Sequence, residues 1–313
     1  MQHIAVEIPK SDGYQAALDA ARTNARDDCQ VHLFHNVYHE NIIDQHGAGD
    51  QVLEEARNLL MNARKDRLNA LAAKYFAGRA DTRLAWSNSS WQALIRFACE
   101  QHCNMVVAQT WRHTRWERLG LSNDDWELIR HCPFPLLLAR DGVQRPYRRI
   151  IAAVDPLHVD DKPASLDEAI VRQAVQLANQ HRASLSVINV VAPAMHVAPG
   201  PLATTPAAAM DQSEEIVAQH RAAVRQLESD VGQSFDDVIV VPGHPADTLV
   251  ECATSTQADL VVMGAVSRSR LKRLVIGSTA ERVLDRLPCD VLVVKQPEMS
   301  EVSPGVAALM SHA

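Results

Sequence analysis

The stretch Ile150-Ile-Ala-Ala-Val-Asp155-Pro156 decides the fold, because it is a short apolar run closed by an acidic residue and a proline. Such a run predicts a strand that is buried on both faces, as the strands of parallel sheets are. The next segment, Ser165–Arg182, carries apolar residues at helical spacing, and Leu185–Val191 is again apolar and β-branched. Strand, helix and strand in this order predict a βαβ unit.

The rest of the second half keeps the alternation of strands and helices. Ala192–Pro206, rich in proline and alanine, is expected to be a long loop, and loops of this length are often lids. The expected elements that follow are a helix over 211–231, a strand over 237–241, a helix over 246–256, a strand over 260–263, a helix over 278–287 and a strand over 291–294. The second half is therefore predicted to be a doubly wound α/β domain with a parallel sheet.

The first half repeats this pattern. A shift of 155 residues sets 126–140 on 281–295 without a gap and 105–108 on 260–263, and a shift of 147 sets 4–9 on 151–156. The difference of eight is expected to lie in loop insertions of the second copy. We predict two tandem Rossmann-like domains, 1–141 and 149–297, joined by a linker over 141–149 and followed by a loosely held tail.

Composition narrows the function classes. The formal net charge of −7 disfavours nucleic acid as a partner. No secretory signal and no apolar run of about 18 residues is found, which argues against secretion and against a membrane. The six cysteines are scattered through apolar segments and are expected to be reduced. We expect a cytoplasmic protein.

The segment after the fourth strand of the second half carries an anion-binding pattern. It reads Gly264-Ala-Val-Ser267, nine further residues, then Gly277-Ser278 at the start of an expected helix. Glycine lets the backbone approach a phosphate, and the free N–H groups of a helix start point at it. This spacing resembles the nucleotide loop of the universal stress proteins, in which a second glycine stands at the place of Ser267. Met263 and Thr279 also match that family, and the resemblance covers essentially the whole chain.

The resemblance implies an adenine nucleotide alpha hydrolase-like fold and a site for ATP or AMP, with Mg²⁺ if ATP binds. By resemblance, Asp155 would contact the adenosine, and Val154 and Val190 would line the base pocket. The loop residues of this expected site are Met263, Gly264, Ser267, Arg268, Gly277, Ser278 and Thr279. For Asp155 the alternative role is a turn or helix cap, and for the cations at 268–273 it is a solvated loop face.

Two departures from the family pattern bear on this site. Ser267 replaces a glycine, which would cost about 1–2 kcal/mol if the residue needed positive φ, so affinity or ligand would change. The first copy has lost the loop: the shifts place Gln109 on Gly264 and Ile8 on Asp155. Three tryptophans, Trp111, Trp116 and Trp126, are expected to pack over the vacated pocket, the alternative being a hydrophobic ligand there. A degenerate first half beside a nearly intact second half resembles the tandem E-type members of the family.

Other chemistry has weaker support. Cys99 and Cys103 are spaced for a metal but are expected on a buried helix face, and His32 and His35 are expected to be strand-end residues. No nucleophile elbow or P-loop lysine is present. The resemblance implies a stress-response protein that acts by binding a nucleotide, and the missing motifs lead us to expect that it is not an enzyme. The alternatives are a slow ATPase using Asp155 or His244 and a scaffold with two degenerate sites.

The expected partners, besides the nucleotide, are an unidentified protein and the chain's own repeats. The last strands of the two halves, 136–138 and 291–294, are expected to pair within one chain and shield each other's edges. The sequence leaves open whether whole chains dimerise.

Overall fold

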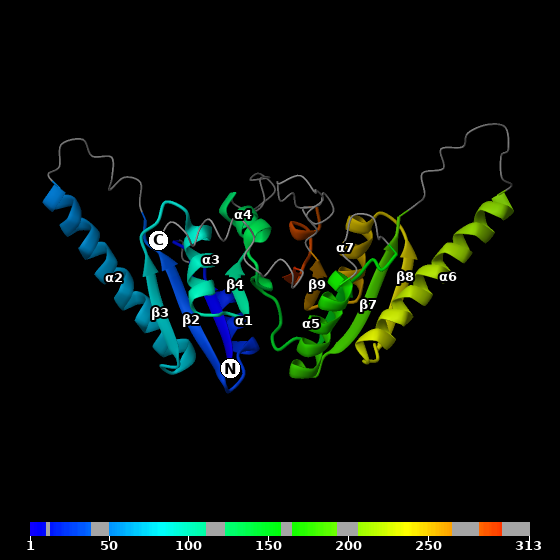
Figure 1. Ribbon diagram of the computed structural model, residues 1–313, viewed down its shortest axis with the longest axis horizontal. Helices are drawn as coiled ribbons and strands as arrows, with labels where there is room; N and C mark the ends of the chain where they lie inside the picture. Colours follow the sequence, from blue (N-terminus) through cyan, green and yellow to red (C-terminus); the bar gives the residue numbers. More distant parts are fainter. Residues whose placement is uncertain are drawn as a thin grey trace. The chain divides into compact units, whose positions relative to one another are not determined.

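The computed structural model of the chain (Figure 1) describes residues 1–10, 13–38, 50–110, 123–157, 165–192, 206–264 and 282–295. These residues belong to two compact units, which lie within Met1–Arg145 and Pro146–Pro297. Within each unit the strands pair in parallel and helices cover both faces, as the sequence predicts.

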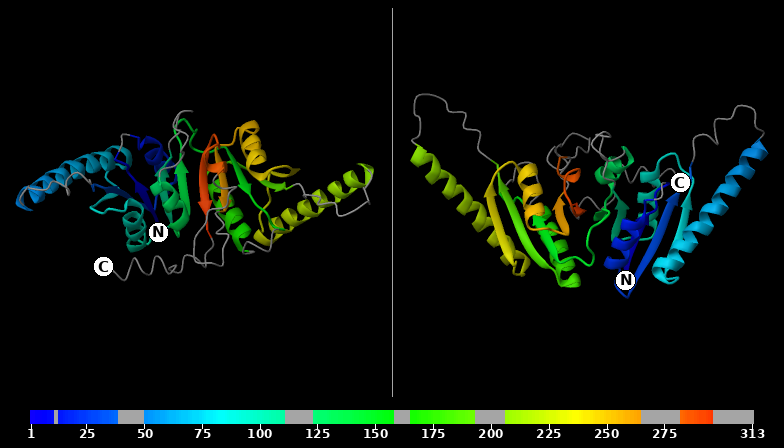
Figure 2. Two further views of the ribbon diagram at one scale, coloured as in Figure 1. Left: turned by 90° about the horizontal axis from the view of Figure 1, so that it is seen from above. Right: turned by 180° about the vertical axis from the view of Figure 1, so that it is seen from behind.

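The first unit contains β1 (Gln2–Glu7), α1 (Gln15–Asn24), β2 (Cys29–Asn36), α2 (Asp50–Phe76), β3 (Ala80–Ala85), α3 (Ser90–Glu100), β4 (Met105–Gln109), α4 (Asn123–His131) and β5 (Leu136–Ala139). Its strands pair in parallel in the order β3-β2-β1-β4-β5. Helices α1 and α2 contact each other on one face of this sheet, and α3 and α4 contact each other on the opposite face (Figure 2).

The second unit contains β6 (Arg149–Ala153), α5 (Ser165–His181), β7 (Ser184–Val191), α6 (Pro206–Val231), β8 (Asp237–Pro242), α7 (Pro245–Ser255), β9 (Leu260–Gly264) and β10 (Asp290–Val294). The strand order β8-β7-β6-β9-β10 repeats that of the first unit, again with parallel pairs. Helices α5 and α6 contact each other on one face, and α7 packs on β7 from the other. The doubly wound α/β class predicted for both halves is confirmed.

Burial of the strands explains why their sequences are apolar without alternation. Every residue of β4, β5 and β10 is buried, so side chains of both faces of these strands are shielded from water and are almost all apolar. β3, at the edge of its sheet, has no buried residue, and its side chains from 80 to 83 alternate between half-buried and exposed. The apolar cores therefore lie between each sheet and its two helix layers.

Two predicted helix bounds are wrong. α6 begins at Pro206, within the segment expected to be a loop, because proline fits the first turn of a helix and the following alanines favour helix. The helix expected over 278–287 is helical at 282–284 and turns thereafter, and its first residues lie outside the described ranges. The remaining part of the expected lid, 193–205, also lies outside them.

The sheet registers correct the alignment of the two first strands. In the first unit Ile4 pairs with Met105, and in the second unit Ile150 pairs with Leu260. Met105 and Leu260 are equivalent by the shift of 155, so their partners Ile4 and Ile150 are equivalent too. The first strands are therefore related by a shift of 146, not 147. Pro9, and not Ile8, stands where the second unit has Asp155. The shifts of 155 and 146 therefore differ by nine residues, not eight. At Pro9, as at Ile8, the first unit has no acidic residue to match Asp155.

The amino-terminal edge of the second sheet is closed by polar contacts from the segment predicted as a linker. Tyr147 is fully buried, and its hydroxyl donates to Asp290 Oδ2 over 2.8 Å. The backbone N–H groups of Arg148 and Arg149 donate to Asp259 Oδ2 over 2.7 and 2.9 Å. The end of the predicted linker is therefore an integral part of the second unit.

No helix in the described parts of the chain combines the length and the apolar composition needed to cross a membrane.

Tyr147→Phe should lower the free energy of unfolding by about 1–3 kcal/mol, because it deprives a fully buried carboxylate of a donor. Urea unfolding of the full chain measures this. The control is Tyr75→Phe, which removes an exposed hydroxyl bond to Gln15 and should cost less than about 0.5 kcal/mol. Equal losses in the two variants would contradict a structural role for the buried bond.

Candidate functional site

The candidate site lies at the carboxyl edge of the second sheet, where β6 has β7 on one side and β9 on the other. Chain connections leave β6 and β9 in opposite directions here, which is where doubly wound sheets bind ligands. Ala153 pairs with Met263, so Val154 and Asp155 leave the sheet beside Gly264. The tertiary structure thus brings together the described residues that the sequence selected from the first and fourth strands of this unit.

Asp155 is held in place from two sides. Its backbone N–H donates to Oδ1 of the buried Asp167 in the first turn of α5, over 3.1 Å. Its own Oδ1 lies 3.4 Å from the Asn189 side-chain nitrogen of β7. Asp155 is itself half-buried, so its carboxylate is oriented at the strand end and still reaches the surface.

Asn189 connects Asp155 to α6 and was not predicted as a site residue. It is fully buried, and its side-chain nitrogen donates to the carbonyl oxygen of Val154 over 2.9 Å. Its Oδ1 accepts from His220 Nδ1 of α6 over 2.7 Å, so the proton of this imidazole is on Nδ1. The sequence signal for this contact was a carboxamide in the largely apolar strand 185–191.

The remaining described site residues contribute apolar surface or backbone. Val154 and Met263 are buried, at 6% and 7% exposure, and Val190 is half-buried on the face of β7 opposite Asn189. A Cβ on Gly264 would lie 2.8 Å from Cδ2 of Leu166 and 3.1 Å from Cδ1 of Ile170. Glycine at 264 therefore allows α5 to approach the end of β9 closely. The predicted phosphate-binding residues Ser267, Arg268, Gly277, Ser278 and Thr279 lie outside the described ranges.

In the first unit a side chain fills the corresponding place. Gln109 occupies the position of Gly264 and is buried, and its Oε1 accepts from the backbone N–H of Ala16 over 3.0 Å. Its amide nitrogen donates to the carboxylate of Asp141 over 3.2 Å. Gln109 thus occupies the free N–H groups at the start of α1, which gives a physical reason for the predicted loss of the site. Trp126 is half-buried in α4, and Trp111 and Trp116 lie outside the described ranges.

The cysteine and histidine pairs considered from the sequence show no metal site. Within the described ranges, no three or more His, Cys, Asp or Glu residues are arranged to hold a metal ion. Cys103 is buried, and this burial raises the pKa of its thiol to about 12. His32 is not a strand-end residue as expected: it lies within β2, stacked on His3 with ring centroids 5.4 Å apart.

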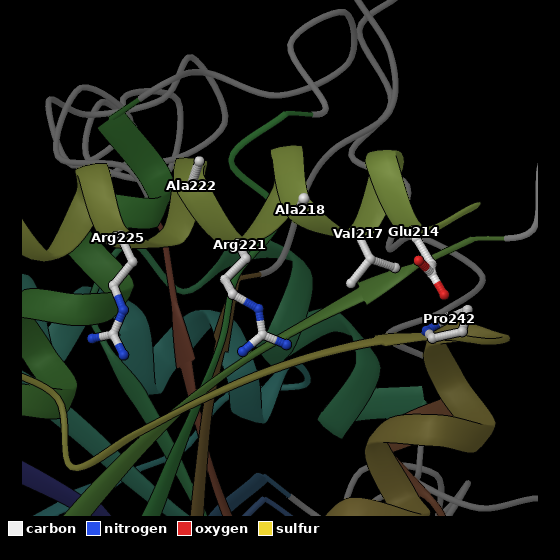
Figure 3. Close-up of a pocket in the computed structure, with 7 residues that line it drawn as sticks. All are labelled: Glu214, Val217, Ala218, Arg221, Ala222, Arg225 and Pro242. Atoms are coloured by element: carbon white, nitrogen blue, oxygen red, sulfur yellow. The ribbon is translucent and has the colours of Figure 1, made fainter. Parts of the chain in front are cut away.

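A groove of about 660 Å³ lies between α6 and the end of β8 (Figure 3). Its lining residues are Glu214, Val217, Ala218, Arg221, Ala222, Arg225 and Pro242. Arg221 and Arg225 extend side by side from α6, and Val217 and Glu214 point toward Pro242. None of the described residues predicted for the nucleotide site, Val154, Asp155, Val190, Met263 and Gly264, lines this groove.

Comparison with known proteins shows one family whose model matches both halves of the chain. Residues 1–140 and 146–295 match the model of the universal stress protein family. The chain is 28% identical to universal stress protein E of Escherichia coli K12 over 229 residues, 71% of each chain. It is similar in fold to a functionally unknown protein from Pseudomonas aeruginosa PAO1, with a TM-score of 0.68, 24% identity and 100% and 98% of the two chains covered. A universal stress protein from Archaeoglobus fulgidus DSM 4304 covers 93% of this chain and 98% of its own, with a TM-score of 0.62 and 13% identity. The expected likeness to the tandem E-type members is confirmed.

Gly264→Ala should destabilise the chain by about 1–3 kcal/mol, because the added methyl group overlaps Leu166 where α5 meets β9. Thermal or urea unfolding measures the loss. Gly142→Ala does not serve as a control, because Gly142 has a φ of +75° and alanine would be strained there. The control is instead the double variant Leu166→Ala/Gly264→Ala compared with Leu166→Ala alone. If the close approach is the cause, adding Gly264→Ala to a Leu166→Ala background should cost less than it does alone.

Proposed function

This chain belongs to the universal stress protein family, and from this premise we propose that its second unit binds an adenine nucleotide, ATP or AMP. The protein acts in the stress response by binding, and its occupancy changes what it associates with. The first unit does not bind nucleotide in the same way.

The observation that carries this proposal is the fixed carboxylate of Asp155 at the switch point of the second sheet. Asp167 holds its backbone and Asn189 lies against its side chain, so the carboxylate is oriented before any ligand arrives. A carboxylate at this position accepts hydrogen bonds from sugar hydroxyl groups. Val154, Val190 and Met263 supply apolar surface near it for a base.

The phosphates would lie along the loop from Gly264 to Thr279, with contacts from Ser267, Arg268, Gly277 and Ser278. The support for this part is the spacing of the glycines and the run of cations in a chain of net charge −7. Among the described residues no carboxylate cluster is arranged for Mg²⁺, so we expect any Mg²⁺ to arrive with the phosphates of ATP.

Binding without turnover is favoured by the surroundings of Asp155. Its neighbours are the Asn189 carboxamide, which does not titrate, and the Asp167 carboxylate, whose Oδ1 accepts from the backbone N–H of Asp155, and both bonds orient Asp155. His244, the other residue considered for a slow ATPase, is exposed and precedes α7. Hydrolysis is therefore the outcome to be tested rather than the expected one.

We also propose that the protein acts in the cytoplasm. All six cysteines are free thiols, and Cys103, Cys132 and Cys289 are buried, which suits a reducing compartment. Pairing of the two last strands within one chain, dimerisation of whole chains and a protein partner stay predictions.

Asp155→Asn should weaken binding of ATP and AMP by about tenfold or more, because hydrogen bonds to a charged acceptor contribute about 1.5–3 kcal/mol. Calorimetric titration of the full chain measures this, with chromatography of the nucleotide to detect hydrolysis. The control is Asp237→Asn, which removes the same charge from an exposed residue at the opposite end of the sheet.

A second variant, Gly277→Asp, puts a negative charge against the phosphates and should abolish the same single site. If the parent chain neither binds nucleotide nor retains one through purification, the nucleotide proposal is wrong and Ser267 marks a degenerate site of a scaffold. Conversion of bound ATP to ADP that depends on Asp155 would instead identify a slow ATPase.

A further inference from the structure

A second, narrower pocket lies at the carboxyl edge of the first sheet, between the end of β1 and α2. Its described lining consists of Ile8, Pro9, His35, Arg64, Arg67, Leu68 and Leu71. The volume open to water is about 10 Å³, enough for one water molecule. The pocket therefore has room for one oxygen atom, with the rest of any ligand lying at the mouth.

The described charges around this pocket are all positive. Arg64 and Arg67 are half-buried on α2, and Lys10 is exposed just beyond β1. Within the described part of the chain, neither Arg64 nor Lys10 makes a hydrogen bond or an ion pair, and no described lining residue is acidic. Arg67 is positioned by the ring of Tyr14, 5.4 Å from its guanidinium carbon. Arg64 and Lys10 thus have no counter-charge in the described part of the chain, and a bound anion would supply one.

His35 forms the polar wall of the pocket. It is 5% exposed, and its Nδ1 donates to the carbonyl oxygen of Ile8 over 2.7 Å, which leaves Nε2 for another partner. Burial lowers the pKa of His35, the bond to Ile8 raises it, and the charges of Arg64, Arg67 and Lys10 lower it further. An anion bound beside these cations would weaken their effect on the imidazole.

The same place in the second unit has the opposite charge. By the register shift of 146, Pro9 and Lys10 stand where the second unit has Asp155 and Pro156. His35 and Asn189 are equivalent as well, because each binds the carbonyl oxygen of the last residue before that position. A site that offers acceptors in one unit offers cations in the other.

The helix that covers the strand-end pocket, α2 in the first unit and α6 in the second, also carries different side chains. Each helix buries two side chains three residues apart, Leu68 and Leu71 on α2, Val224 and Leu227 on α6. Arg64 lies four residues before Leu68 on α2, and His220 lies four residues before Val224 on α6. Arg64 and His220 therefore occupy equivalent positions on the two helices. The hydrogen bond of His220 with Asn189 is thus replaced by a guanidinium in the first unit.

We infer that this pocket binds the phosphate group of a small phosphorylated molecule. A phosphate monoester carries about −1.5 to −2 charges at pH 7, which matches several cations better than a single carboxylate does. Arginine forks fit phosphate oxygens in paired hydrogen bonds. The hydroxyl oxygen of the monoprotonated phosphate enters the pocket and donates to Nε2 of His35, and the other oxygens face Arg64, Arg67 and Lys10 at its mouth.

The test is a titration of the full chain with inorganic phosphate, followed through the imidazole signals of His35 in NMR spectra. Loss of a signal in His35→Gln assigns it. We expect a saturable shift of this signal, and Arg64→Gln should weaken the response by about tenfold or more because it removes a charge-assisted contact. Arg64→Lys, which keeps the charge, should retain part of the affinity.

The matched control is Arg79→Gln, which removes the same charge from an exposed residue before β3 and should change the affinity by less than about twofold. No shift of the His35 signal in the parent chain, or equal weakening by Arg64→Gln and Arg79→Gln, would overturn the inference. Circular dichroism of each variant establishes that it is folded.

Two further arms separate this site from the nucleotide site and identify the source of the phosphate. Asp155→Asn should leave the response of His35 to phosphate intact while it weakens nucleotide binding, and loss of the His35 response in that variant would overturn the inference. A response to AMP that depends on Arg64 indicates phosphate monoesters as ligands. A response to phosphate alone indicates free phosphate, and both results support the phosphate pocket.

Discussion

A buried side chain on the second strand of each unit binds the carbonyl oxygen at which the first strand leaves the sheet. In the second unit Asn189 donates to Val154, and in the first unit His35 donates to Ile8. A carbonyl buried at a strand end needs a partner, since leaving it unsatisfied costs about 1–3 kcal/mol. The rest of each strand-end site depends on this bond, because it fixes the direction in which the chain leaves the sheet.

The choice of residue for that bond separates the two units. Asn189 uses its remaining oxygen to accept from His220, and its amide lies against Asp155. The result is a hydrogen-bond network with one oriented carboxylate. His35 has a single remaining nitrogen and lies among the cations of α2. The same backbone requirement is therefore met by two chemistries, one suited to hydroxyl donors and the other to an anion.

The contact between the fourth strand and the first helix differs in the same manner. At Gly264 the absence of a side chain lets Leu166 and Ile170 of α5 approach the strand end. At the equivalent Gln109 the amide occupies the first free N–H groups of α1. The two units thus keep one register and one strand order, and they differ in the few side chains that end the strands. The different ligands proposed for the two units rest on these few side chains.

The sequence by itself determined the alternation of strands and helices, the repeat by 155 residues and the position of Asp155, because apolar runs and helical spacing are local patterns. It placed α6 five residues late, since an alanine-rich segment after proline is typical of a loop as well as of a helix. The shift between the first strands was wrong by one residue, because short apolar runs align nearly as well after a slip and only backbone pairing fixes the register. Tertiary structure alone decided that Tyr147 is buried on Asp290 and that Asn189 meets His220. These partners lie 143 and 31 residues apart in the chain, and no local pattern records a contact over such a separation.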